Sequence, residues 1–75
     1  MCLAIPAKVL SISGNMAEVD LMGNQKQINI NLVGEELKPG DYVLVHAGYA
    51  LEKVDEDIAL ETLKLLEEAF ELSEH

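Results

Sequence analysis

The spacing of the apolar residues changes at Asp55, and this change constrains the fold more than any other feature of the sequence. Before it, apolar and polar residues alternate in short segments, as in a β-strand with one buried face. After it, apolar residues recur at helical spacing. The 75-residue chain is therefore expected to be mainly β, with a small five-stranded barrel over residues 1–54, followed by a helix over residues 55–75, in a single domain.

The turn residues divide the first part into strands. Gly14-Asn15 and Gly23-Asn24 are expected to form hairpin turns, because glycine supplies the positive φ that such turns require. Pro39-Gly40 marks a further turn, and Gly48 is expected to allow a bend or a bulge. The strands are expected at residues 9–12, 16–22, 27–32, 42–47 and 49–54. Short strands with frequent turns indicate a closed or nearly closed barrel, which removes exposed edges.

The last part of the chain has the pattern of an amphipathic helix. Asp55 is a good N-cap, and Glu56 and Asp57 place negative charge where the helix dipole favours it. Apolar residues fill about half of the helical wheel, and Leu60 alone lies on the charged side. A helix of this length is marginal without tertiary contacts. It is expected either to pack on the barrel and complete the core or to extend from it and dock on a partner.

The net charge of −9 excludes several classes of function. Fourteen acidic residues face five lysines and no arginine, which argues against binding to nucleic acid or to an anionic membrane surface. The acidic excess at the end of the chain is expected to be the solvated face of the helix. The sequence shows neither a secretory signal nor the ~20 apolar residues of a membrane span. With one cysteine, no internal disulfide is available, and a cytoplasmic location is expected.

Cys2 is the only cysteine, and it is the first candidate for chemistry. Met1 is expected to be removed, because the side chain that follows it is small. The protonated α-amine would then lower the pKa of the neighbouring thiol and favour the thiolate. A thiolate is a soft ligand, suited to iron, copper(I) or zinc. Leu3, Ile5 and Pro6 could hold Cys2 at a defined place, although Cys2 could also be an incidental small residue.

His46 is the second candidate, in the segment YVLVHAG. The period of two leaves open whether Val43 and Val45 or Leu44 and His46 face the interior. A single histidine near a strand end is often structural. No Cys/His spacing fits a zinc site, and the acidic residues form no convincing acid–base pair, so the chain is not expected to be an enzyme.

Three segments, MCLAIPAKV, AEVDLMG and PGDYVLVHAGYALEKVDEDIA, together resemble the HypC (HupF) family of small hydrogenase maturation chaperones. The resemblance covers essentially the whole chain. It implies a barrel like the oligonucleotide/oligosaccharide-binding (OB) fold with a C-terminal helix, in agreement with the pattern above. It also implies a metallochaperone role in assembly of the nickel–iron hydrogenase active site.

The same resemblance implies partners and site residues. HypC-like proteins form a complex with the iron–sulfur protein HypD, on which iron acquires cyanide and carbon monoxide, and they bind the precursor of the hydrogenase large subunit. Cys2 corresponds to the family's essential cysteine, and His46 to its histidine. Cys2 would share iron with a partner's ligand, while His46 would orient or protonate the thiolate or bind the iron. The apolar surface that partners cover would consist of Leu3, Ala4, Ile5 and Pro6.

Three other interpretations remain at this point. The chain could be an adaptor that binds proteins without touching metal. It could be a thiol enzyme with Cys2 as nucleophile and His46 as base, although so small a barrel has little room for a substrate cleft. A nucleic-acid-binding barrel is the third, and the charge argues against it.

Overall fold

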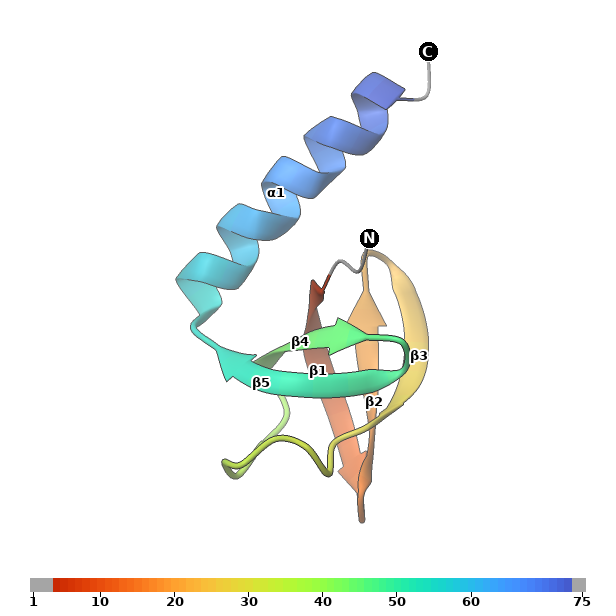
Figure 1. Cartoon of the computed structure of the whole chain (residues 1–75), viewed down its shortest axis with the longest axis vertical. Coiled ribbons are helices and arrows are strands. Elements are labelled where there is room, and N and C mark those ends of the chain that lie inside the picture. Colours follow the sequence, from red (N-terminus) through yellow and green to blue (C-terminus); the bar gives the residue numbers. More distant parts are fainter. Residues whose placement is uncertain (1–3, 74–75) are drawn as a thin grey trace.

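A computed structural model describes the backbone of residues 4–73 and the side chains of residues 4–69. It contains five strands followed by one helix: β1 Ile5–Ser13, β2 Met16–Leu21, β3 Asn24–Asn29, β4 Tyr42–His46, β5 Tyr49–Val54 and α1 Glu56–Ser73. The strands close a barrel in the order β1-β2-β3-β5-β4, and β4 returns to pair with β1 (Figure 1). The predicted fold class, a small β-barrel followed by one helix, is confirmed.

One face of each strand supplies the core of the barrel. Its largest fully buried side chain is Ile28 of β3, which lies opposite Ala17 of β2. The predicted alternation in β2 is confirmed, because Ala17 and Val19 are buried while Glu18 and Asp20 are partly exposed. The core comprises Ala7, Val9, Ala17, Val19, Ile28, Val43, Val45 and Ala50. No polar side chain in the described part of the chain is buried, so apolar packing holds the barrel together.

The second hairpin turn differs from the prediction by one residue. Leu21 pairs with Asn24, so the turn consists of Met22 and Gly23, with φ of 53° and 92°. Two successive positive φ values define a type I′ turn, whose twist suits a two-residue hairpin. This turn fixes the register of β3, which therefore spans Asn24–Asn29 rather than residues 27–32. Leu32, predicted to lie in the strand, is 60% exposed in the following loop.

Strand β1 begins at Ile5, four residues earlier than predicted, and pairs with two neighbours in turn. Its first half, Ile5 to Lys8, pairs with β4, and its second half, from Lys8 onward, pairs with β2. The backbone N–H and C=O groups of Val9 form hydrogen bonds with Asp41 and Gly40, on the β4 side. Because the direction of these groups alternates along a strand, the backbone nitrogen of Pro6 faces the β2 side. The β2 ladder begins only at Lys8. The missing N–H of Pro6 therefore costs no ladder hydrogen bond.

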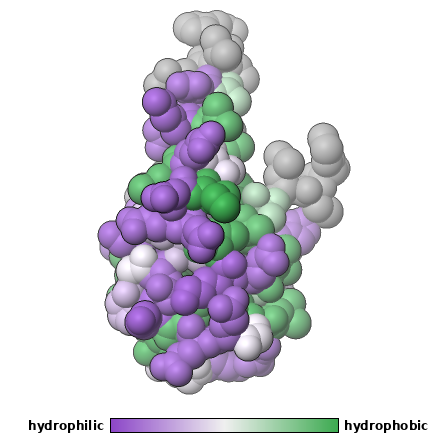
Figure 2. Space-filling view, turned by 90° about the vertical axis from the view of Figure 1, so that its left-hand side faces the viewer, coloured by the Kyte–Doolittle hydropathy of each residue, from purple (hydrophilic) through white to green (hydrophobic). Residues whose placement is uncertain are grey.

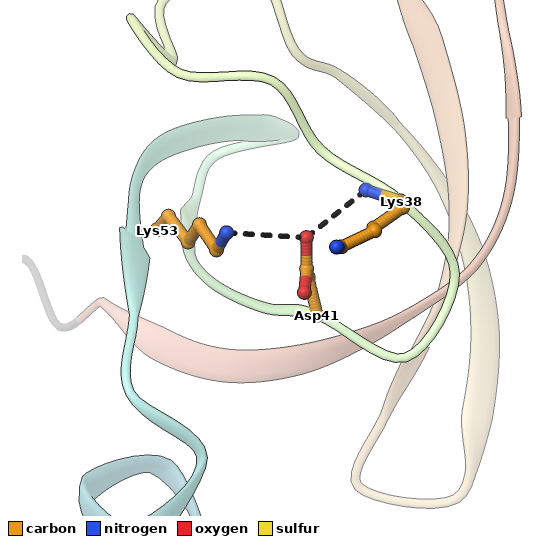
Figure 3. Close-up of polar contacts among 3 residues, drawn as sticks. All are labelled: Lys38, Asp41 and Lys53. Carbon is orange, nitrogen blue, oxygen red and sulfur yellow. Dashed lines mark hydrogen bonds and ion pairs between the residues drawn. The ribbon is translucent and has the colours of Figure 1, made fainter.

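The loop between β3 and β4 ends in a tight turn (Figure 3). The backbone N–H of Asp41 donates to the carbonyl oxygen of Lys38 at 3.1 Å, with Pro39 and Gly40 at the two central positions. The carboxylate of Asp41 accepts from the backbone N–H of Lys38 at 3.0 Å and forms an ion pair with Lys53 at 3.5 Å. The predicted Pro-Gly turn is therefore present, and its side-chain contacts fix the entry into β4.

Helix α1 begins as predicted, because the carbonyl oxygen of Asp55 accepts the first helical hydrogen bond from Ala59 at 2.9 Å. Ala59 is fully buried where the helix contacts β1 and β4, and the rest of the helix extends away from the barrel (Figure 1). Ile58 and Leu65 also lie on the predicted apolar half, but their side chains are 58% and 60% exposed and do not share the burial of Ala59. Figure 2 shows hydrophobic side chains on the helix flanked by hydrophilic ones. The apolar half is thus wider than its contact with the barrel.

Candidate functional site

The beginning of β1 lies beside the end of β4. Ile5 pairs with Val45 and Pro6 with Leu44, so the next step of this antiparallel register leads to Ala4 and His46. Ile5 and Val45 are 40 positions apart in the sequence, and the barrel brings them together. The structure thereby places the first described residues next to the histidine singled out from the sequence.

A two-residue turn presents His46. His46 pairs with Tyr49, and Ala47 and Gly48 between them have φ of 53° and 84°, which makes a second type I′ turn. The bend expected at Gly48 is this turn, and the irregularity in the β4–β5 ladder lies one step away, between Leu44 and Val45. His46 is therefore held at the end of a short hairpin rather than on a loose loop.

The orientation of β4, left open by the sequence, is now decided. Val43 and Val45 face the core, while Leu44 and His46 face outward and are partly exposed. None of the hydrogen bonds between described residues uses the imidazole of His46. The imidazole can thus be reached from outside the barrel.

The other candidate residues have different environments. Pro6 is fully buried, whereas Ala4 and Ile5 are partly exposed. Cys2 and Leu3 lie outside the described residues, so a joint site of Cys2 and His46 stays a prediction. Between residues 4 and 69, no group of three or more His, Cys, Asp or Glu side chains is placed to hold a metal ion, and no pocket is formed.

Tyr49 is a site residue that the sequence reasoning missed. Its side chain is 48% exposed and shares the outer face of the hairpin with His46, as paired residues on adjacent strands do. The signal was the Ala-Gly pair between them, which gives a two-residue turn and so makes His46 and Tyr49 neighbours. Exposed aromatic rings such as that of Tyr49 are enriched at surfaces that bind other proteins.

No helix in the described chain is both long enough and apolar enough to cross a membrane.

The architecture defines a small closed barrel with one projecting helix, in which a histidine-bearing hairpin flanks the start of the first strand. The model of the HupF/HypC family matches residues 1–66, and the chain belongs to this family.

Relatives from several bacteria carry the same name, hydrogenase maturation factor HypC. That of Rhizobium leguminosarum bv. viciae is 48% identical over 69 residues, covering 91% of each chain. That of Helicobacter hepaticus is 46% identical over 69 residues, covering 91% of this chain and 80% of the relative. The Escherichia coli K12 protein is 35% identical over 77 residues, covering 96% of this chain and 86% of the relative.

Proposed function

We propose that this protein is a chaperone for maturation of nickel–iron hydrogenase. With a HypD-like iron–sulfur protein, it holds an iron dicyanide-carbonyl group and delivers it to the precursor of the hydrogenase large subunit. The observation that carries the proposal is membership of the HupF/HypC family over residues 1–66, a span that includes both Cys2 and His46. The relatives named as hydrogenase maturation factors support the process, and the delivered group is the finer part of the proposal.

The register of β1 supports a role for Cys2 near His46. Cys2 precedes Ala4 by two residues, so chain geometry limits the distance between their Cα atoms to about 7 Å. Ala4 follows the Ile5–Val45 pair towards His46. A thiolate at Cys2 is thus within reach of the outer face of the β4–β5 hairpin. In the proposal, His46 orients or protonates this thiolate.

The proposed transfer is an exchange of ligands on iron. The Cys2 thiolate donates an electron pair to the iron, and ligands from the HypD-like protein complete the coordination. On delivery, a thiolate of the precursor forms a new Fe–S bond while the bond to Cys2 breaks. Cys2 keeps the electron pair of the broken bond and takes up a proton from water or from His46. The iron changes neither charge nor oxidation state.

The test is a pull-down of the chain from its host, with analysis of iron content and infrared bands of bound cyanide and carbon monoxide. Cys2→Ala is expected to abolish the iron and both bands. Ser13→Ala, at the far end of β1, is the matched control and is expected to keep them. Retention of the iron group and of hydrogenase activity by Cys2→Ala would falsify the carrier role. An intact complex that never contains iron, with normal maturation, would instead identify an adaptor.

A further inference from the structure

The barrel has one seam that is closed by very little pairing. Between β3 and β5 only Asn29 and Tyr49 are paired within the described chain, whereas β2 pairs with β3 along its whole length. The outer edge of β3 from Asn24 to Ile28 therefore has no strand beside it among residues 4–73. Figure 1 shows the β4–β5 turn meeting β3 where this pairing occurs.

Two hydrogen bonds reveal which backbone groups point out of this edge. The N–H of Asn29 donates to the carbonyl oxygen of Gly48 at 3.0 Å, on the β5 side. The N–H of Ile30 donates to Asn15 at 2.9 Å, on the β2 side. Because backbone direction alternates along a strand, Gln25 and Gln27 share the outward direction of Asn29. Their N–H and C=O groups bond to no other described strand and point towards a possible partner.

The composition of β3 disfavours self-association through this edge. A pair of β3 strands would bring together two chains that each carry a net charge of −9, and it would place Lys26 close to its own copy. A lysine on an edge strand is a common guard against such pairing. Strand β3 itself contains no acidic residue, so it does not repel a neutral segment of another protein.

Apolar side chains lie at the end of the open edge. Tyr49 pairs with Asn29, and Leu32 follows three residues after Asn29 in the loop; the two side chains are 48% and 60% exposed. Outward main-chain groups at every second residue provide the hydrogen bonds that hold an added strand. The edge ends at Gly48, two residues from His46.

We propose that Gln25 to Gln27 bind an extended segment of the client polypeptide, which adds to β3 as a further strand in line with β5. For the identity of the client, the large-subunit precursor, this inference rests on the proposed function. Main-chain hydrogen bonds to Gln25 and Gln27 hold the segment, and its end lies beside Gly48 and the His46 hairpin. The edge thereby directs the client to the place where Cys2 would release its cargo.

Gln27→Pro tests the edge, because it removes an outward N–H without removing a bond to β2. The matched control is Gln27→Val, which changes the same side chain and keeps the N–H. Both purified variants are titrated with purified precursor by isothermal calorimetry. Gln27→Pro is expected to weaken binding about tenfold or more, from the lost hydrogen bond and the bulk of the ring, and Gln27→Val to stay within about threefold.

Hydrogen exchange on the unaltered protein gives a second measurement that does not depend on how the proline variant folds. On binding of the precursor, the amides of Gln25 and Gln27 are expected to become protected, while that of Lys26 is protected with and without it. If proline at position 27 binds like the unaltered protein, or if these two amides stay unprotected in the complex, the edge inference is wrong and the proposed function stands. If the unaltered chain binds no precursor, both the edge inference and the proposed function are wrong.

Discussion

Ala47→Asn is expected to stabilise the protein, and the reason lies in one backbone angle. Ala47 occupies the first central position of the β4–β5 turn with φ of 53°, a conformation that costs an ordinary L-residue about 1–2 kcal/mol. Asparagine tolerates this region better, and Asn-Gly is the preferred pair for a type I′ turn. The net gain in the free energy of unfolding should be about 1 kcal/mol. For a domain of this size, such a gain raises Tm by about 4–8 °C.

Thermal unfolding followed by circular dichroism measures this change. The control is Ala69→Asn on the exposed side of α1, where the same substitution should lower stability by about 0.5 kcal/mol because asparagine is a poorer helix former. Met22→Asn, at the equivalent position of the β2–β3 turn with φ of 53°, should repeat the gain. Stabilisation at position 69 and destabilisation at both turns would refute the assignment of strain to these turns.

Two further predictions concern the barrel. Ile28→Ala removes three carbon atoms from a side chain that is 2% exposed and should cost about 2–5 kcal/mol, whereas Leu32→Ala, at 60% exposure, should cost less than about 0.5 kcal/mol. Urea denaturation compares the two, and equal losses would contradict the described core. Asp41→Ala should cost about 1–2 kcal/mol, because it removes the acceptor for Lys38 and the ion pair with Lys53, while Asp41→Asn keeps an acceptor and should cost less than about 1 kcal/mol. If Asp41→Asn loses as much stability as Asp41→Ala, the ion pair with Lys53 contributes more than the hydrogen bond from Lys38.

The strands, turns and helix could be predicted from the sequence, because residue period and turn residues act over a few neighbouring positions. Period and turn residues predicted the number and approximate positions of the five strands, and Asp55 predicted the start of the helix. The bounds predicted for β3 were wrong, and its turn was placed one residue too late, because Gly23 was assigned to the first central position, whereas Met22 takes that position in spite of its positive φ. No sequence pattern predicts that a methionine will adopt a positive φ.

The site was harder to predict, because non-local pairing assembles it. Nothing in the spacing of Ile5 and Val45 reveals that they are paired, and the position of the start of β1 beside His46 depends on that pair. The open edge of β3 could not be predicted either, because it results from the short pairing between β3 and β5 rather than from any residue in β3. The family resemblance supplied Cys2 and His46 as a pair, whereas periodicity supplied only their surroundings.

The β4–β5 turn links the two surfaces on which the proposals depend. Its carbonyl oxygen at Gly48 accepts from Asn29 at the end of the open edge. Its flanking strand, β4, is the only described strand that pairs with the start of β1, because β2 pairs only from Lys8 onward. Pro6 reinforces this one-sided attachment, since its nitrogen can donate to neither neighbour. A change that loosens the turn should therefore move His46, the start of β1 and the end of the β3 edge together, whereas a change at the Gly14 turn should reach only the end of the β3 edge, through the bond from Ile30 to Asn15.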